Sequence, residues 1–269
     1  MKNISFSEVK VYEECPWKHK LLYRDKVVKQ KKTQYLAFGL AFHATIEELH
    51  KNPECDPVLF FEERLIAEFL LIVEEEVFKK KTRQQEYDEM LEQGKQLVVL
   101  IIPALKEKFP EYQFIACEEK LEIPLTSIEV SQPFQFKGYI DFIIKLPSGK
   151  TIIIDFKTSS LGWTAQEKTN KITTYQLTLY KHFYCEKYSI NPKEVEVYFA
   201  IIKRTGKKEH FDIFEVGCGT KKLSNCIEFL KGKVKLIDKK VLIKKYDSCH
   251  KKTGFSINTC DFYKTEHCQ

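Results

Sequence analysis

Two aspartates and one lysine near the middle of the chain have the types and spacing that phosphate chemistry needs. Asp141 lies in GYIDF, and Asp155 and Lys157 lie in IIIDFKTSS. Carboxylate oxygens are the ligands that Mg²⁺ and Mn²⁺ prefer, and such a cation can activate water and neutralise charge developing on a phosphodiester. A neighbouring ammonium group could orient that water or stabilise the same charge. These residues predict a metal-dependent site for phosphate-ester hydrolysis.

The segment between the aspartates determines how they face each other. Residues 147–149, Pro-Ser-Gly, form a predicted three-residue turn between two strands. Antiparallel pairing centred on this turn places Ile143 opposite Ile153 and Asp141 opposite Asp155. Like charges directly opposed on a sheet are destabilising, and a divalent cation would offset them.

Alternation along the two strands assigns each side chain to one face of the hairpin. Asp141, Asp155 and Lys157 share one face. The other face is the predicted core side, and it carries Ile140, Phe142, Ile144, Leu146, Ile152, Ile154 and Phe156. A charged strand face is also compatible with an ordinary solvated surface, but the opposed aspartates favour the metal site.

The rest of the chain must supply the elements that position this hairpin. Helical spacing predicts helices over residues 7–23, 37–50, 171–188 and 220–237, and a helical lobe over residues 56–109. A period of two predicts strands over residues 113–125, 135–146, 150–157, 194–203 and 208–215. This order indicates an α/β fold, a mixed sheet with helices on its faces.

The hairpin sequence resembles the catalytic core of the PD-(D/E)XK nuclease superfamily, in the branch of RecB-type exonucleases and CRISPR adaptation nucleases. FGLAFHATIEEL resembles the first helix of that branch, whose metal-binding histidine falls on His43. TYQLTLY resembles its Gln-x-x-x-Tyr helix, which falls on Gln176 and Tyr180. These elements occur in the family's order over residues 38–180.

The resemblance implies a restriction-endonuclease-like core with a mixed central sheet flanked by helices, plus an α-helical lobe. We expect one domain over residues 1–269, with a helical insertion at about 53–110 and a cysteine-containing tail at about 246–269. The implied activity is metal-dependent DNA cleavage, as an exonuclease on DNA ends or single strands in recombination, repair or viral genome processing. A non-cutting DNA-binding module and an RNA endonuclease are the alternatives, because fold does not fix substrate.

The implied metal ligands are His43, Asp141 and Asp155, which would hold Mg²⁺ or Mn²⁺, and Lys157 completes the catalytic set. Gly39 precedes His43 by one helical turn and would let this helix approach another backbone closely. A lone histidine on an apolar helix is more often structural, but two aspartates that need a third ligand favour a metal role. Glu47 lies one turn further along the same face and could support the site.

Gln176 and Tyr180 are four residues apart and therefore share one helical face. They could contact DNA or steady Lys157, or Tyr180 could instead pack in the core. Glu119 is a further candidate acid, although its strand face is left open by the sequence. Four basic residues could line a strand-guiding channel or lie on a solvated surface, and these are Lys203, Arg204, Lys207 and Lys208.

The cysteines suggest a second, separate site. FSEVKVYEECPWKHKLLYRD resembles the start of family members that bind an iron–sulfur cluster, with the first ligand on Cys15. The C-terminal segment offers Cys249, Cys260 and Cys268, and four thiolates suit a [4Fe–4S] cluster. The spacing departs from the family, because Tyr263 stands where a cysteine is usual. The alternatives are unligated thiols or zinc bound by Cys260 and Cys268 with His250 and His267.

Composition limits the remaining possibilities. The chain has 269 residues, 43% of them hydrophobic, which is enough for a substantial core. A net charge of +6 fits a polyanionic partner such as DNA without indicating a nucleic-acid coat. No apolar run approaches the length of a membrane span, and the N-terminus lacks a signal-peptide pattern, so we expect a soluble, cytoplasmic protein without a membrane partner.

Overall fold

The computed structural model describes residues 1–27, 32–73, 78, 81–206, 209–245, 249–253 and 256–268. The chain forms two compact units. The first, called the terminal unit, comprises residues 1–30, 122–138 and 220–269, and the second, called the catalytic unit, comprises residues 31–121 and 139–219. The expectation of one domain over residues 1–269 stays a prediction. In the described residues, no helix has the length and apolar character needed to cross a membrane.

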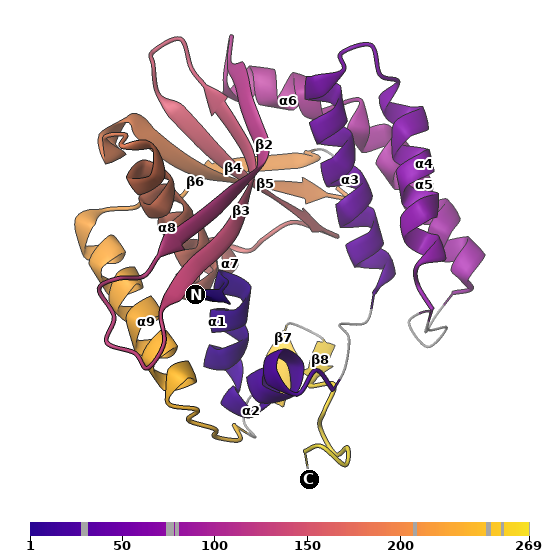
Figure 1. Ribbon diagram of the computed structural model, residues 1–269. Coiled ribbons are helices and arrows are strands. Elements are labelled where there is room, and N and C mark those ends of the chain that lie inside the picture. Colours follow the sequence, from indigo (N-terminus) through magenta and orange to yellow (C-terminus); the bar gives the residue numbers. More distant parts are fainter. Residues whose placement is uncertain are drawn as a thin grey trace. The chain divides into compact units, whose positions relative to one another are not determined.

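A mixed sheet forms the centre of the catalytic unit (Figure 1). Its strands are β2 (Gln113–Pro124), β3 (Phe134–Lys145), β4 (Thr151–Ser159), β5 (Val195–Lys203) and β6 (Phe211–Glu215). The last four lie side by side in that order, and β2 pairs with β3. The β3–β4 and β5–β6 pairs are antiparallel, whereas β4 and β5 are parallel. The predicted α/β class with a mixed central sheet is therefore confirmed.

The turn between β3 and β4 has the predicted form. Leu146 N–H donates to Lys150 O at 2.8 Å, and Gly149 N–H donates back to Leu146 O at 2.9 Å. Gly149 has a φ of 86°, in the left-handed region that glycine adopts without steric cost. Ile143 pairs with Ile153 as the turn predicts. The local turn chemistry thus sets the register of the whole hairpin.

Helices cover one face of this sheet and share a single core with it. Thr33, Asp56 and Thr82 each cap a helix by accepting a backbone N–H of the first turn. The helices are α3 (Gln34–Lys51), α4 (Pro57–Leu70), α5 (Arg83–Val98) and α6 (Ile101–Lys108). The sheet residues in this core are Phe142, Ile144, Ile152, Ile154, Phe156, Tyr198, Ala200 and Ile202.

The opposite face of the sheet is also covered, because α8 (Lys171–Tyr188) lies on the other side from α3 (Figure 1). Ile143, Ile153 and Phe199 point to that face and are fully buried. The sequence assigned only one apolar face to the hairpin, whereas the structure buries both. Consequently Asp155, which has the same parity as Ile153, starts from a buried position rather than a solvated one. The short elements α7 (Ala165–Lys168) and η3 (Pro192–Glu194) complete this unit.

The terminal unit joins the two ends of the chain. Its elements are β1 (Lys2–Ile4), α1 (Phe6–Glu14), α2 (Pro16–His19), the π-helical turn η1 (Lys20–Arg24), α9 (Thr220–Asp238), β7 (His250–Thr253) and β8 (Ser256–Thr259). β1 pairs in parallel with the start of β3. Tyr12 OH donates to Val241 O at 2.7 Å, and Trp17 Nε1 donates to His267 O at 2.9 Å. These contacts hold the first helices against the C-terminal segment.

The predicted helix over residues 7–23 is wrong as a single element. Cys15 is extended, with φ −158° and ψ 113°, and separates α1 from α2. Pro16 follows it, and proline disfavours helical backbone in the residue before it while starting a helix easily. The predicted helix over residues 171–188 coincides with α8. The short elements β1 and α7, at residues 2–4 and 165–168, were not predicted from the sequence.

Gly94 gives a test of the packing among α3, α4 and α5. A Cβ atom at this position would lie 1.9 Å from Cε1 of Phe61, a fully buried ring. Gly94→Ala should lower the melting temperature, because overpacking costs about 1–3 kcal/mol against a helix-propensity gain of about 1 kcal/mol. Gly232→Ala is the matched control on α9, where a Cβ meets nothing within 4 Å.

Thermal denaturation followed by far-UV circular dichroism measures both variants. The control should melt at or above the wild-type temperature, since alanine favours the helix and meets open space. Equal melting temperatures for Gly94→Ala and Gly232→Ala would contradict the close packing of Gly94 on Phe61.

Candidate functional site

The β3–β4 hairpin opens at the two aspartates. Its pairing ends at Phe142 and Ile154, one residue before Asp141 and Asp155 would pair. At this point Phe156 N–H donates to Asp141 Oδ2 at 2.9 Å. The predicted register is therefore confirmed up to Phe142, but the predicted direct pairing of Asp141 with Asp155 is not formed. The Asp141 carboxylate accepts a backbone donor at the place where the strands separate.

Asp155 is held in a buried position. It is 1% exposed, and Gln176 Nε2 donates to its Oδ1 at 3.1 Å. Lys157 Nζ lies 2.6 Å from its Oδ2 and forms an ion pair with it. Burial raises the pKa of Asp155 to about 6, with Asp141 adding to the shift and Lys157 opposing it.

Asp141 and Lys157 complete the charged part of the site. Burial raises the pKa of Asp141 to about 6, against the opposing effects of Lys157 and the Phe156 N–H. Burial alone would lower the pKa of Lys157, but Asp155 and Asp141 outweigh it and raise that pKa above its ordinary value. The Lys157 side chain is 35% exposed, and its ammonium group stays protonated at neutral pH because of this raised pKa.

His43 reaches this group from α3. A Cβ on Gly39, one turn earlier, would lie 3.4 Å from Thr158 Oγ1, so α3 runs close to β4 here. The His43 ring meets the Phe156 ring edge-on at 5.9 Å, and its Nδ1 lies 3.8 Å from Asp141 Oδ2. Burial and the Lys157 charge lower the pKa of His43 to about 4. The imidazole is thus neutral at physiological pH and retains a lone pair for a metal.

Gln176 and Tyr180 project from α8 toward the same residues. Besides holding Asp155, Gln176 Nε2 donates to Tyr180 OH at 3.3 Å. Tyr180 is 7% exposed, and burial together with the Asp155 charge raises its pKa to about 12. The helix face they share therefore supports the carboxylate from the side opposite α3. Direct contact of Gln176 or Tyr180 with DNA stays a prediction.

A third carboxylate, Glu118, faces the pocket and was missed by the sequence analysis. The pocket is lined by His43, Ile46, Glu47, Cys117, Glu118, Asp141, Phe142 and Phe156. Burial raises the pKa of Glu118, and the Glu47 and Asp155 charges add to the shift. Glu118 has a φ of 50°, so strict strand alternation is interrupted here. Nothing in the residue types of β2 marks this position, and only the backbone reveals it.

Glu119, the acid that the sequence offered, points elsewhere. It pairs with Lys187, and Tyr188 OH donates to it. These contacts lower the pKa of Glu119 despite the opposing effect of burial. Glu119 is therefore engaged with the C-terminal end of α8, away from the pocket lining. Glu47, by contrast, lines the pocket and is paired with Lys51.

The donor set fits a hard divalent cation. Asp141 and Asp155 supply carboxylate oxygens and His43 supplies a neutral imidazole, which are donors that such a cation binds. As the described side chains stand, no group of three or more His, Cys, Asp or Glu residues is arranged to hold a metal ion. The match to a divalent cation therefore depends on the type of these donor atoms and on the negative charge of the two carboxylates.

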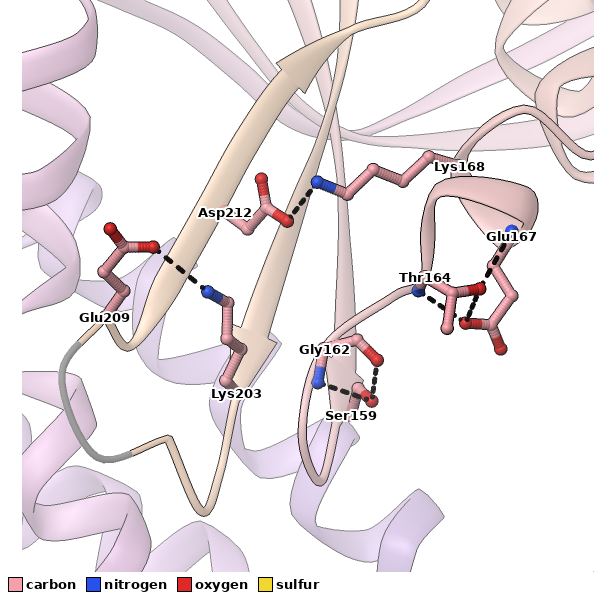
Figure 2. Close-up of polar contacts among 8 residues, drawn as sticks. All are labelled: Ser159, Gly162, Thr164, Glu167, Lys168, Lys203, Glu209 and Asp212. Carbon is pink, nitrogen blue, oxygen red and sulfur yellow. Dashed lines mark hydrogen bonds and ion pairs between the residues drawn. The ribbon is translucent and has the colours of Figure 1, made fainter. Parts of the chain in front are cut away.

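The loop that follows Lys157 is closed by its own polar contacts. Ser159 Oγ accepts from Gly162 N–H at 3.2 Å and donates to Gly162 O at 3.0 Å (Figure 2). Gly162 has a φ of 101°, which this turn requires. Thr164 then caps α7 together with Glu167. The segment after β4 is thus tied down locally beside the site.

The basic residues proposed for a strand-guiding channel are partly engaged in such contacts. Lys203 pairs with Glu209 at 3.6 Å (Figure 2). Arg204 Nη2 donates to Ser160 Oγ at 2.9 Å. Lys207 and Lys208 lie outside the described residues. The channel therefore stays a prediction, with Arg204 acting at least to hold the loop after β4.

Four cysteines of the terminal unit lie close together. Cys260 N–H donates to Cys249 O at 3.1 Å. Burial raises the pKa of Cys249, and charges on Cys260, Cys268 and Cys15 add to the shift, so these three thiols lie near Cys249. As their described side chains stand, these cysteines are not arranged to hold a metal ion. The His250 side chain, part of the zinc alternative, lies outside the described residues.

A family model described as "PD-(D/E)XK nuclease superfamily" matches residues 3–251. The solved structure titled "Crystal structure of SSO0001" is 17% identical, with a TM-score of 0.34, and the match covers 82% of this chain and 84% of that one. Among curated proteins, none matches this chain.

The raised pKa of Asp141 predicts how its replacement affects the metal-free protein. Because the folded-state pKa is about 6 against an ordinary 3.8, this carboxyl favours folding when protonated, and that contribution is lost as pH rises through about 6. Asp141→Asn keeps an acceptor for Phe156 N–H and carries no charge. In EDTA, the variant's melting temperature relative to wild type should therefore rise between about pH 4 and pH 7.

The measurement is a series of thermal melts across this range for both proteins. Asp88→Asn, which removes an exposed carboxylate on α5, is the control and should show a smaller dependence on pH. A difference between Asp141→Asn and wild type that does not change with pH would contradict the assigned shift.

Proposed function

This chain belongs to the PD-(D/E)XK nuclease superfamily, a group of metal-dependent phosphodiester hydrolases, and from this membership we propose that it cuts DNA. The observation that carries the proposal is the convergence of His43, Asp141, Asp155 and Lys157 at the open end of the β3–β4 hairpin. We further propose exonuclease action on DNA ends or single strands, in recombination, repair or viral genome processing.

His43, Asp141 and Asp155 are the proposed ligands of Mg²⁺ or Mn²⁺. When bound, the cation would lower the pKa of a water molecule and neutralise charge on the scissile phosphate. The low pKa of His43 keeps its lone pair available, and Gln176 fixes the orientation of Asp155 through Oδ1. Because Gln176 engages Oδ1, the other oxygen of Asp155, Oδ2, would be available to a bound cation, with Lys157 beside it.

Lys157 has the proposed role of stabilising the charge that develops on the phosphate. Its pKa is raised above its ordinary value, so it does not act as a general base at neutral pH. The ammonium group is partly exposed and lies 2.6 Å from Asp155, at the place where a phosphate oxygen would approach a cation held by that carboxylate. A preorganised positive charge there favours the transition state more than the substrate.

Lys157→Ala provides the direct test of this role. The variant should lower the cleavage rate at saturating Mn²⁺ by about 10²–10³-fold, the usual loss when one charge-stabilising donor is removed. Lys150→Ala is the matched control, because Lys150 lies on the same hairpin and pairs with Glu196 on the surface. The measurement is single-turnover cleavage of labelled DNA, with circular dichroism to verify folding.

The choice of substrate separates the proposed function from its alternatives. Linear single-stranded DNA, blunt duplex DNA, circular single-stranded DNA and RNA are compared with Mn²⁺ and with EDTA. Degradation of linear but not circular DNA supports an exonuclease. Preferential cleavage of RNA would replace DNA as the substrate, and full activity of Lys157→Ala would remove that residue from the mechanism. DNA binding without any cleavage would leave a non-cutting module.

For the terminal unit we propose that Cys15, Cys249, Cys260 and Cys268 bind a [4Fe–4S] cluster. The proposal is supported by the effect of the other three thiols on the raised pKa of Cys249. Trp17 Nε1 donates to His267 O at 2.9 Å, which already holds the N- and C-terminal ligand segments together. Such a cluster would add a covalent link between these two segments.

Protein purified without oxygen should contain about four irons and four acid-labile sulfides per chain, with visible absorption that Cys260→Ser abolishes. Cys185→Ser is the control, because Cys185 is buried on α8 in the catalytic unit. Zinc in place of iron would support the zinc alternative. The absence of both metals from anaerobic protein would contradict the cluster and leave unligated thiols.

A further inference from the structure

Glu118 has a place in the metal pocket that the proposed ligand set does not account for. It lines the pocket together with His43 and Asp141. The Asp155 charge raises the pKa of Glu118, and the Glu118 charge raises the pKa of Asp141. Glu118 lies on β2, so it approaches the pocket from a strand that carries none of the other proposed ligands.

The backbone of β2 changes direction at this residue. Glu118 has a φ of 50°, a left-handed conformation that L residues other than Asn, Asp and Gly seldom adopt. In a regular strand, consecutive side chains point to opposite faces. Here both Cys117 and Glu118 line the same pocket, while Glu119 pairs with Lys187. The local distortion thus brings Glu118 to the face of the metal site.

The charges in the pocket do not balance. Lys157 pairs with Asp155, and Glu47 pairs with Lys51. In the described part of the chain no ion pair or hydrogen bond to the Glu118 carboxylate is formed, and Asp141 accepts only the neutral Phe156 N–H besides its approach to His43. Lys157 thus compensates both Asp155 and Asp141, and the exposed Glu118 carboxylate is left without an ion pair in the described residues.

We propose that Glu118 binds the divalent cation of this pocket together with Asp141, and so supplies a carboxylate oxygen in addition to the imidazole nitrogen of His43 and the carboxylate oxygens of Asp141 and Asp155. This inference rests on the proposed function, because it concerns the same cation. An additional oxygen ligand matches the six-coordinate preference of Mg²⁺ and Mn²⁺, which three protein ligands leave incomplete. The strained backbone at Glu118 is then a consequence of directing this ligand into the pocket.

The test compares Glu118→Gln with Glu119→Gln, an identical change at the next residue of the same strand. Mn²⁺ binding to the full chain is measured without nucleic acid, by isothermal titration calorimetry and by loss of the free Mn²⁺ electron paramagnetic resonance signal. Glu118→Gln should weaken Mn²⁺ binding by at least about tenfold, as removal of a direct charged ligand does. Glu119→Gln should bind Mn²⁺ as the wild type does.

Thermal melts distinguish a metal ligand from a structural residue. In EDTA, Glu118→Gln should melt at or above the wild-type temperature, because it removes repulsion among the pocket carboxylates. In Mn²⁺ the wild type should gain more stability than the variant. A residue needed only for folding would give the opposite result, with a lower melting temperature in EDTA and an unchanged gain in Mn²⁺.

Two further variants keep the test decisive if Glu118→Gln folds poorly. Glu118→Asn removes the charge with a residue that tolerates left-handed backbone, and Glu118→Asp retains a carboxylate that does the same. The aspartate variant should bind Mn²⁺ more tightly than the asparagine variant. Equal Mn²⁺ affinity of the wild type, Glu118→Asn and Glu118→Gln would overturn the inference.

The outcomes also separate this inference from the proposed function. If the wild type binds Mn²⁺ but cuts no nucleic acid, the nuclease proposal fails, while the binding data still decide the role of Glu118. If the wild type cuts DNA and Glu118→Gln binds Mn²⁺ normally, only the role of Glu118 is lost. If the wild type binds no Mn²⁺, both proposals are overturned.

Discussion

The repulsion between buried carboxylates is the constraint around which the catalytic unit is arranged. Burial alone disfavours the charged form of Asp141 and Asp155, while the Asp141 charge adds to the cost of ionising Asp155 and the Glu118 charge adds to that of ionising Asp141. The sheet resists that repulsion because apolar residues are buried on both of its faces. Without this packing, the strands could separate further or the carboxylates could turn to solvent. The stability of the sheet thus allows an unfavourable charge arrangement to persist where β3 and β4 part.

Each neighbouring group relieves this repulsion in a different way. Lys157 supplies a positive charge, Gln176 supplies a neutral donor, and Phe156 supplies a backbone N–H. Burial and the Lys157 charge keep His43 neutral, so it adds a lone pair rather than a second positive charge. A protonated His43 would compensate the carboxylates by itself and would repel a cation. Because His43 stays neutral, part of the negative charge of the carboxylates remains uncompensated, and this charge favours the binding of a metal cation.

The sequence predicted those parts of the structure that depend on local chemistry. The turn at residues 147–149 set the hairpin register, and helical spacing located α8 correctly. The break at Cys15 was not predicted, because the helical pattern of residues 7–23 continues across it and only Pro16 disfavours helical backbone there. The orientation of Glu118 was beyond sequence reasoning, because alternation places consecutive residues on opposite faces and a single φ of 50° overrides it.

The site also draws on both layers of helices, which explains why its residues are so far apart in the sequence. The helix α3 brings His43 to Asp141 on one side of the sheet, while α8 brings Gln176 to Asp155 on the other. The side chains from the two helices can meet only where neighbouring strands separate, since continuously paired strands would keep them on opposite faces of the sheet. The end of the β3–β4 pairing at Phe142 and Ile154 provides that opening. Strand separation is therefore a geometric requirement of a site whose supporting residues come from opposite faces of one sheet.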